Sequence, residues 1–327
     1  MIISRTPFRI SFFGGGTDYP VWYRENGGAV LATSIDKYCY ITGRYLPPFF
    51  EHKWRIVYSQ TELVNSLEEI HHPSVRETLR FMDIKDGVEI HHDGDLPART
   101  GLGSSSAFTV GFLNALHGLK GDTPGKKQLA EEAITIEQKI IRENVGSQDQ
   151  ITAAFGGLNR IDFNGEGFKV NPINLRPERQ EELENHLMLF FTGISRTASQ
   201  IAGEQIKQTP NKKKELDEMY GMVGSAIKIL ENHGGIGDFG RLLHENWILK
   251  RSLSGKISSL YIDYIYETAL NSGAIGGKLL GAGGGGFILF FVEPELREKV
   301  RKSLQGLLYV PFRFENTGSS IIYNSRG

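Results

Sequence analysis

Hydrophobic and polar residues follow a strand-like pattern in the first part of the chain and a helix-like pattern in much of the rest. Residues 9–13 predict a strand that ends in a tight turn of three glycines, and residues 27–47 predict two strands separated by polar breaks. Residues 53–59 and 88–97 add strand character, whereas residues 61–83 predict a helix. The pattern therefore favours a mixed α and β fold.

The middle of the chain predicts two strong helices. Residues 104–119 are apolar on nearly every face, which is typical of a buried helix. Residues 126–146 carry an apolar stripe through Leu129, Ala133, Ile136 and Ile140, and we expect this helix to end near Gly146. Asp149 then falls in a loop, and a turn at residues 156–157 leads into another strand.

The last part of the chain begins after a charged segment at residues 173–186, which we interpret as a boundary. A short strand at residues 187–193 precedes three helices at 211–233, 238–253 and 258–272, the first and third ending at Gly234 and Gly273. A glycine run at residues 281–286 then opens a strand, and a helix and a final strand or two follow. Because 327 residues exceed one comfortable core, we predict two domains, 1–180 and 181–327.

Composition and charge exclude several classes of protein. Lys plus Arg is 37 and Asp plus Glu is 38, so there is no overall basic field, which argues against nucleic acid as a partner. Cys39 is the single cysteine and fits a reducing compartment. Neither a signal peptide nor an apolar run of membrane-spanning length is visible, so we expect a cytoplasmic protein without a membrane partner.

The 39 glycines cluster, and two clusters resemble known ligand sites. Gly281, Gly283 and Gly286 match G-x-G-x-x-G, but the run follows a predicted helix and opens a strand, so we reject a dinucleotide fingerprint. The stretch PARTGLGSSSAF (97–108) could be a capped loop, a serine-nucleophile site or a phosphate cradle. It lacks the second glycine of a nucleophile elbow. Its glycines admit backbone N–H groups to a ligand, and the helix start that follows favours an anion.

Three acidic residues and one arginine are candidates for chemistry. Glu137 shares a face with apolar residues and needs a cation, either a nearby lysine or a metal ion. Asp149, taken alone, is equally a turn former or a helix N-cap. Asp18 could accept a hydrogen bond from a sugar hydroxyl, or it could only form an Asx-turn. Arg9 could bind a phosphate, or it could be an ordinary surface arginine.

Three motifs in order resemble those of the GHMP kinase superfamily, which includes galactokinase, homoserine kinase and mevalonate kinase. They are PFRISFFGGGTDYP near the N-terminus, PARTGLGSSSA in the middle and KLLGAGGGGF near the C-terminus. Together they span residues 7–287. The resemblance implies an α+β two-domain fold, with a ribosomal-S5-like N-terminal domain, a ferredoxin-like C-terminal domain and the active site between them.

The resemblance also implies roles for individual residues. Asp149 and Arg9 would be catalytic, with Asp149 as the proposed base and Arg9 near the transferred phosphoryl group, while Ser105 and Glu137 would hold Mg²⁺. ATP would be bound by Pro97, Gly101, Leu102, Gly103, Ser104, Ser105 and Ser106. The substrate would be contacted by Gly16, Thr17, Asp18, Arg196, Gly283 and Gly284. Lys250 and Arg251 are further candidates, or else part of a solvated helix face.

Within the superfamily, the sequence looks most like the bacterial D-glycero-D-manno-heptose 7-phosphate kinases. The segments GGGTDYP, GISRTAS and LLHENWILKRSLSGKIS carry this likeness. Galactokinases have Glu-His where this chain has Gly15 and Gly16, which argues against galactose. The implied partners are ATP and a sugar phosphate. A fucokinase-like or other free-sugar kinase, a catalytically inactive sugar-binding protein, a serine hydrolase and a homodimeric state are left open.

Overall fold

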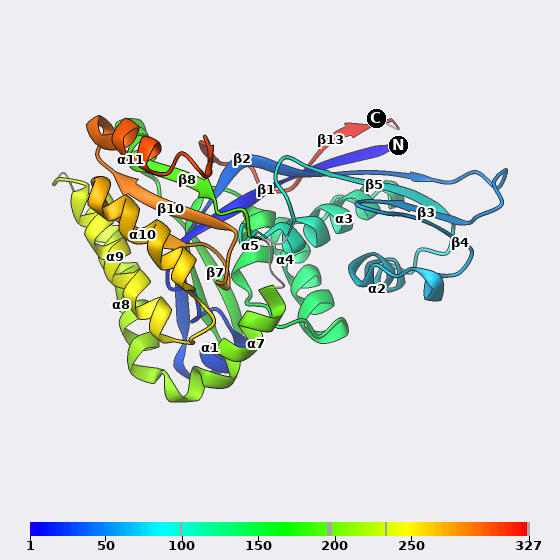
Figure 1. The fold of residues 1–327 in the computed structure, drawn as a ribbon. Helices are drawn as coiled ribbons and strands as arrows, with labels where there is room; N and C mark the ends of the chain where they lie inside the picture. The colour runs from blue at the N-terminus through cyan, green and yellow to red at the C-terminus, as the bar shows by residue number, and fades with distance from the viewer. Residues whose placement is uncertain (99, 195–197, 233, 326–327) are drawn as a thin grey trace.

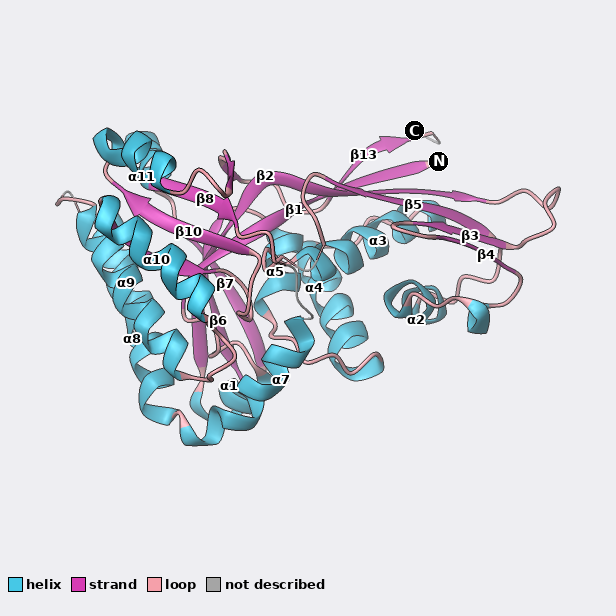
Figure 2. Ribbon diagram, in the orientation of Figure 1, coloured by secondary structure: helices cyan, strands magenta, loops and turns pink. Residues whose placement is uncertain are grey.

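The computed structural model describes residues 1–98, 100–194, 198–232 and 234–325, and these residues form two sheets with their own helices (Figures 1 and 2). This arrangement confirms the predicted α+β class with two domains. The strands of the first sheet are β1 (Ile2–Phe13), β2 (Gly28–Tyr45), β3 (Trp54–Val57), β4 (Thr61–Val64), β5 (Val88–Gly94), β6 (Leu158–Asn164), β7 (Gly167–Pro172), β12 (Phe314–Glu315) and β13 (Ser320–Asn324). The strands of the second sheet are β8 (Leu187–Phe191), β9 (Ala274–Leu279), β10 (Phe287–Val292) and β11 (Leu308–Val310).

The helices fall into two groups along the chain, before and after β8. Those that precede the second sheet are α1 (Pro20–Asn26), α2 (Pro73–Phe81), α3 (Ser104–Lys120), α4 (Lys126–Ile134), α5 (Gln148–Phe155) and α6 (Pro177–His186). Those that follow β8 are α7 (Ala198–Gln208), α8 (Lys213–Glu231), α9 (Gly237–Ser252), α10 (Leu260–Ser272) and α11 (Arg297–Ser303). Short turns of helix lie at Leu67–Glu69, Thr135–Ile140, Thr209–Asn211 and Pro294–Leu296.

The first sheet is organised around one long strand, β2, so the prediction of two strands at 27–47 was wrong. The N-terminal half of β2 pairs with β6 and its C-terminal half pairs with β5, while β1 lies along its other edge and pairs with β13. The polar residues that suggested a break lie where β2 passes from one partner to the other. The two chain ends consequently lie side by side (Figure 1).

Helix α3 packs on β1 and β2 and is buried along most of its length, as its apolar sequence predicts. Gly111 permits this close approach, because a Cβ there would lie 2.7 Å from Thr6 Oγ1. Helices α9 and α10 cover β9 of the second sheet. The rings of Phe12 and Phe13 meet Phe239 edge-on, with centroids 5.5 and 5.2 Å apart, and so join the first sheet to α9.

Several predicted boundaries are corrected by the structure. Residues 61–64 form the strand β4, and the charged segment taken as a boundary contains α6. The helix from Lys126 becomes a π-helical turn at Thr135 and ends near Ile141, where the backbone reverses at Arg142 (φ 63°). Helix α7 was missed, and α8 ends at Glu231 with an extended Asn232 as its cap rather than at a glycine. The Gly273 cap of α10 is confirmed (φ 118°).

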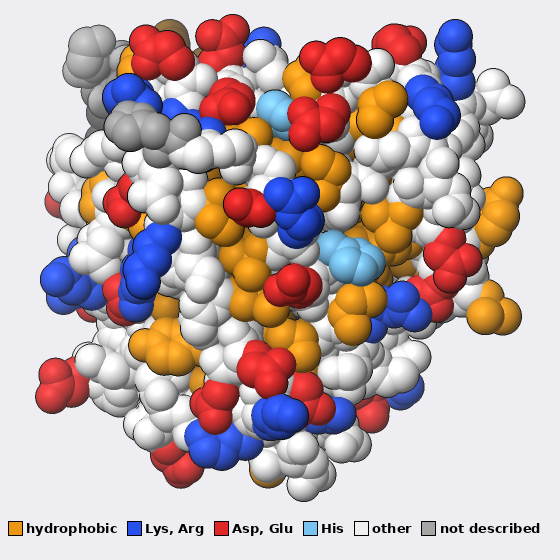
Figure 3. Space-filling view, turned by 90° about the vertical axis from the view of Figure 1, so that its left-hand side faces the viewer, with side chains coloured by type: hydrophobic (Ala, Val, Ile, Leu, Met, Phe, Trp, Pro, Cys, Tyr) orange, Lys and Arg blue, Asp and Glu red, His pale blue; other side chains and the backbone are white. Residues whose placement is uncertain are grey.

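The division at residues 180 and 181 stays a prediction; residue 180 lies within α6, and β12 and β13 return to the first sheet. In the face shown in Figure 3, both signs of charge are interspersed with hydrophobic side chains. No helix within the described residues has the length and hydropathy needed to cross a bilayer.

Candidate active site

A cavity of about 950 Å³ opens between the two domains, and it is bordered by the glycine loop that precedes α3. Gly101 and Gly103 adopt left-handed backbone conformations, with φ of 85° and 75°. A Cβ on Gly101 would lie 2.4 Å from the Leu280 carbonyl oxygen. The loop therefore requires glycine, and it leads directly into the N-terminus of α3 at Ser104. The first N–H groups of a helix have no partner within the helix, and the positive end of the helix dipole lies at the same place, as an anion site requires.

Arg9 and Asp149 form a bidentate ion pair beside this loop. Arg9 donates to both carboxylate oxygens of Asp149 at 2.8 Å, and its Nη1 donates to the Gly101 carbonyl at 2.6 Å. Arg9 comes from β1, whereas Asp149 lies in the first turn of α5 rather than in the predicted loop. The negative charge of Asp149 is favoured at a helix N-terminus. Two residues that lie 140 positions apart in the sequence are thus held together beside the glycine loop.

Asp18 is buried at the wall of the same cavity. It accepts hydrogen bonds from the Gly16 backbone N–H and the Gln148 amide, both at 2.9 Å. Burial raises the pKa of Asp18, with a smaller contribution from the charge of Asp149, while the Gly16 N–H and Lys250 oppose this rise. Gly146 packs so closely that a Cβ there would lie 1.9 Å from Asp18 Oδ2. The position of this carboxyl group is therefore tightly specified.

Glu137 is buried on the π-helical turn after α4, as its apolar neighbours predict. Its Oε2 accepts hydrogen bonds from Ser106 (2.8 Å) and Gln150, so its partners are neutral rather than a lysine. Burial raises the pKa of Glu137 to about 7, although the Thr109, Ser106 and Gln150 side chains lower it.

The other carboxyl oxygen of Glu137, Oε1, is buried and has no hydrogen-bond partner among the residues that the structure describes. The hydroxyl of the nearby Thr109 donates to the Ser105 carbonyl (3.2 Å). Within the described residues, no three His, Cys, Asp or Glu side chains form a metal site. One orphaned carboxylate oxygen beside a phosphate-type loop nevertheless fits Mg²⁺, which usually takes one or two carboxylates and completes its shell with phosphate and water.

Two buried lysines face the cavity near Asp18. Lys250 on α9 is 5% exposed and donates to Gln205 Oε1 at 2.8 Å. The alternative prediction, that Lys250 belongs to a solvated helix face, is therefore wrong. Lys278 on β9 is 4% exposed and donates to the Phe12 carbonyl at 2.8 Å. Burial lowers the pKa of Lys250 to about 8 and that of Lys278 well below its usual range. Sequence reasoning missed Lys278, although a lysine inside an apolar strand is a readable signal.

The opposite end of the cavity is lined by aromatic and imidazole rings that sequence reasoning also missed. The rings of His72 and His92 contact Phe108, with centroids 5.0 and 5.1 Å apart. Glu62 organises this end: it accepts hydrogen bonds from the backbone N–H groups of His71 (2.6 Å) and His72 (3.2 Å) and from the Tyr58 hydroxyl (2.8 Å). These bonds hold the backbone of residues 71 and 72 between β4 and α2, whereas His92 comes from β5.

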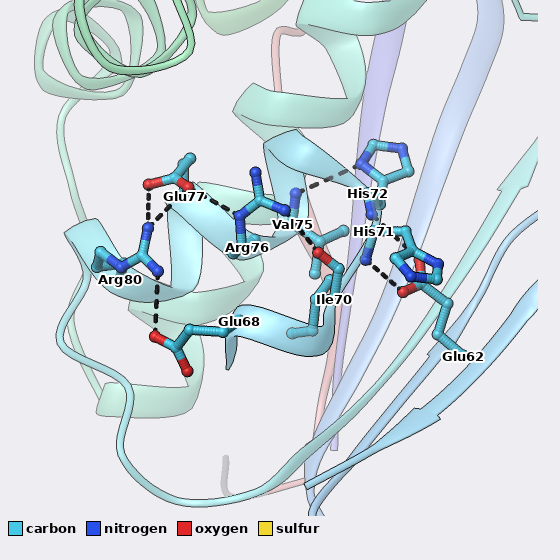
Figure 4. A network of polar contacts seen from close by, with 9 residues as sticks. All are labelled: Glu62, Glu68, Ile70, His71, His72, Val75, Arg76, Glu77 and Arg80. Carbon is cyan, nitrogen blue, oxygen red and sulfur yellow. Dashed lines mark hydrogen bonds and ion pairs between the residues drawn. The ribbon is translucent and has the colours of Figure 1, made fainter. Parts of the chain in front are cut away.

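A network of ion pairs holds α2 in place behind these rings (Figure 4). Arg76 donates to the Ile70 carbonyl (2.7 Å) and to Glu77 (2.9 Å), and Arg80 bridges Glu77 and Glu68. The Val75 N–H donates to the His72 ring at 3.4 Å and caps the helix. The network ties the start of α2 to the segment that carries the cavity wall.

Some predicted site residues do not line the cavity. Thr17 directs its hydroxyl to the Gly14 and Ala29 carbonyls (2.8 and 2.9 Å). Pro97 and Leu102 support the loop through backbone contacts, since their carbonyls accept from Thr100 Oγ1 (2.8 Å) and Arg9 N (3.0 Å). Arg251 instead pairs with Asp263 at 3.2 Å. Arg196 lies outside the described residues.

The C-terminal glycine run shapes the wall rather than offering side chains. Gly283 packs against Ile257, and the Gly284 N–H donates to the Ile257 carbonyl at 2.8 Å. Gly281 contacts the Gly101 backbone and lines the cavity. The run follows the strand β9 rather than a helix, which corrects the prediction, but it still opens a strand and so remains unlike a dinucleotide fingerprint.

Comparison with known sequences places these features in a family. Residues 66–157 match the GHMP kinases N terminal domain, and residues 225–309 match the GHMP kinases C terminal domain. This chain belongs to the GHMP kinase superfamily. It is therefore an ATP-dependent phosphotransferase with the two-domain fold of that superfamily.

Individual GHMP kinases are similar over almost the whole chain. A Campylobacter jejuni D-glycero-alpha-D-manno-heptose 7-phosphate kinase is 30% identical, covering 93% of each protein. The Bacteroides fragilis L-fucokinase/L-fucose-1-P guanylyltransferase is 24% identical over 93% of this chain but only 36% of that protein. A crystal structure of a D-glycero-D-manno-heptose 1-phosphate kinase from Bacteroides thetaiotaomicron has a TM-score of 0.79 at 26% identity, covering 99% of this chain and 100% of that one.

Proposed function

We propose that this GHMP kinase is a Mg²⁺-dependent sugar kinase that transfers the γ-phosphoryl group of ATP to the anomeric hydroxyl of D-glycero-D-manno-heptose 7-phosphate. The product is the 1,7-bisphosphate, an intermediate suited to nucleotide-activated heptose and surface polysaccharide. The observation that carries the proposal is the Arg9–Asp149 ion pair, held between the glycine loop and the buried Asp18 in one cavity. Phosphoryl transfer is mostly positioning and charge stabilisation, and this arrangement supplies both.

Each element of the cavity has a place in this reaction. The backbone N–H groups of 101–106 bind the ATP phosphates, and the ring-lined end near His72 and Phe108 receives the base. Asp18 accepts a hydrogen bond from a sugar hydroxyl. Arg9 orients the Asp149 carboxylate, which accepts the proton of the attacking hydroxyl as its oxygen bonds to the γ-phosphorus and the bond to ADP breaks. Glu137, with Ser105 and Ser106 nearby, would hold Mg²⁺, which supplies charge neutralisation at the phosphates.

The names of the similar proteins support a heptose substrate but differ in detail. One similar protein is named as a heptose 7-phosphate kinase and another as a heptose 1-phosphate kinase. Both names therefore leave the position of transfer to be tested for this chain. The similar fucokinase keeps a free sugar as the second candidate.

The deciding experiment is a substrate panel with ATP and Mg²⁺. It compares heptose 7-phosphate, heptose 1-phosphate, free heptose, fucose and galactose by coupled ADP release. We expect the highest kcat/KM for heptose 7-phosphate. Turnover of fucose or galactose with none of the heptose phosphates would overturn the assignment.

A further inference from the structure

Three cations gather at the acceptor end of the cavity. Arg9, Lys250 and Lys278 line it beside the carboxylates of Asp18 and Asp149, while the carboxylates of Glu143 and Asp93 also line the cavity. Asp149 is occupied by Arg9, whereas Asp18 is bound by the Gly16 N–H and the Gln148 amide. Within the described part of the chain, neither lysine forms an ion pair; their hydrogen-bond acceptors are the neutral Gln205 amide and the Phe12 carbonyl.

Buried hydrogen-bond donors without partners lie in the same place. Because Gln205 presents its oxygen to Lys250, its Nε2 points away, and this nitrogen is buried with no hydrogen-bond partner in the part of the chain that the structure describes. A Cβ added to Gly16 would lie 2.8 Å from this nitrogen, and Gly16 is the residue whose N–H donates to Asp18. The hydroxyl of Ser11, which lines the cavity, is likewise buried with no hydrogen-bond partner among the described residues. Unpaired donors beside buried cations suit an acceptor-rich, negatively charged ligand.

On this basis, and resting on the function proposed above, we propose that Lys250, backed by Lys278 and the Gln205 amide, binds a phosphate ester carried by the acceptor sugar. A dianionic phosphate supplies the counter-charge for two lysines and accepts from several donors at once. The nucleotide is the other source of phosphate, but its phosphates have their own N–H cradle at residues 101–106. Lys250 instead contacts Gln205 of α7, beside Gly16 at the Asp18 wall.

The proposal explains an otherwise costly arrangement. Burying an unpaired cation destabilises the folded protein, and binding of an anionic ligand offsets this destabilisation. Lys250 and Lys278 also repel each other, since the charge of Lys250 lowers the pKa of Lys278. A bound phosphate would relieve both effects. The site therefore selects phosphorylated acceptors over free sugars, which is a statement about specificity rather than about the transfer step.

The test uses Lys250→Met, with Lys250→Arg as the conservative variant and Arg251→Met as the matched control outside the cavity. For each full-length protein we would measure kcat/KM for the phosphorylated and the free form of the preferred sugar, and KM for ATP. Losing a charge-assisted hydrogen bond lowers affinity by about 10- to 100-fold. In Lys250→Met we expect kcat/KM to fall by this factor for the phosphorylated sugar alone, while kcat/KM for the free sugar and KM for ATP stay unchanged. Lys250→Arg should recover part of the lost kcat/KM, and Arg251→Met should behave like the wild type.

Inorganic phosphate separates the two sources of anion. We expect it to inhibit the wild-type enzyme competitively against the sugar phosphate, and this inhibition to be lost in Lys250→Met. Competition against ATP, a raised KM for ATP, or an equal loss for phosphorylated and free sugars would overturn the inference. The wild-type panel reports separately on the substrate: a preference for another phosphorylated sugar that Lys250→Met abolishes would refute the heptose assignment and support this site. A wild-type enzyme with no preference for phosphorylated acceptors would refute the site.

Discussion

The buried charge of Lys250 makes a prediction about stability as well as binding. Replacing it with methionine keeps a similar length and removes the charge. The pKa of Lys250 falls from 10.5 to about 8, chiefly through burial and further through Arg9, while Asp18 raises it. At 1.36 kcal/mol per pKa unit, this shift corresponds to about 3 kcal/mol of destabilisation in the ligand-free protein.

The pH dependence follows from the two protonation states. Below pH 8 Lys250 is charged in both folded and unfolded chains, and the folded state bears the full cost of burying it. Between pH 8 and 10.5 the folded lysine loses its proton while the unfolded lysine keeps it, so wild-type stability rises with pH relative to the variant. Above pH 10.5 both states are neutral and this contribution no longer changes. The free energy of unfolding of Lys250→Met should therefore be higher than that of the wild type by about 3 kcal/mol near pH 7 and by about 1.5 kcal/mol near pH 9.5.

The assay is urea unfolding of ligand-free protein at both pH values, followed by tryptophan fluorescence. Arg251→Met serves as the control, since Arg251 lies outside the cavity and pairs with Asp263. The difference in the free energy of unfolding between wild type and Lys250→Met should become smaller as pH rises. The free energy of unfolding of Arg251→Met should stay within about 0.5 kcal/mol of the wild-type value at both pH values. A less stable Lys250→Met at pH 7, or a pH-independent difference, would show that Lys250 is not an uncompensated buried cation.

Three further changes test the acceptor and metal ends of the cavity. Asp149→Asn should lower kcat by roughly 10²- to 10⁴-fold while the Kd for ATP, measured by calorimetry, stays the same; near-full turnover would remove Asp149 from the mechanism. Glu137→Gln should shift the Mg²⁺ titration of activity to higher concentration, and an unaltered titration would make this residue structural. Gly146→Ala should raise the KM for the sugar by about 10-fold or more, because the new Cβ would lie 1.9 Å from Asp18 Oδ2. Gly125→Ala, where a Cβ meets nothing within 4 Å, is its control, and equal effects in both would refute the packing argument.

The fold was predictable where one local signal dominates. The strand before the triple glycine and the buried helix from Ser104 have unambiguous periodicity, and the structure confirms both. β2 was misread because its polar residues mark a change of pairing partner, which is a tertiary event. The helix from Lys126 ends early because a π-helical turn carries Glu137 inward, and nothing in the residue types alone announces that turn.

The candidate site was predictable to a similar degree. The glycine loop has a local physical reason, and the need for a cation beside Glu137 follows from its apolar neighbours. The Arg9–Asp149 pair joins residues from β1 and α5, so its geometry depends on the assembled fold. Gln205 becomes a candidate only when burial and hydrogen bonding are known, because a glutamine in a sequence is usually solvated.

The most direct test of the central claim is to identify the product. Heptose 7-phosphate, ATP and Mg²⁺ are incubated with the enzyme, and the reaction is followed by ³¹P NMR with proton coupling. The account predicts stoichiometric ADP and a new phosphate ester resonance coupled to the anomeric proton, while the original 7-phosphate resonance persists. ADP release without an anomeric phosphate ester, or transfer only to a free sugar, would contradict it.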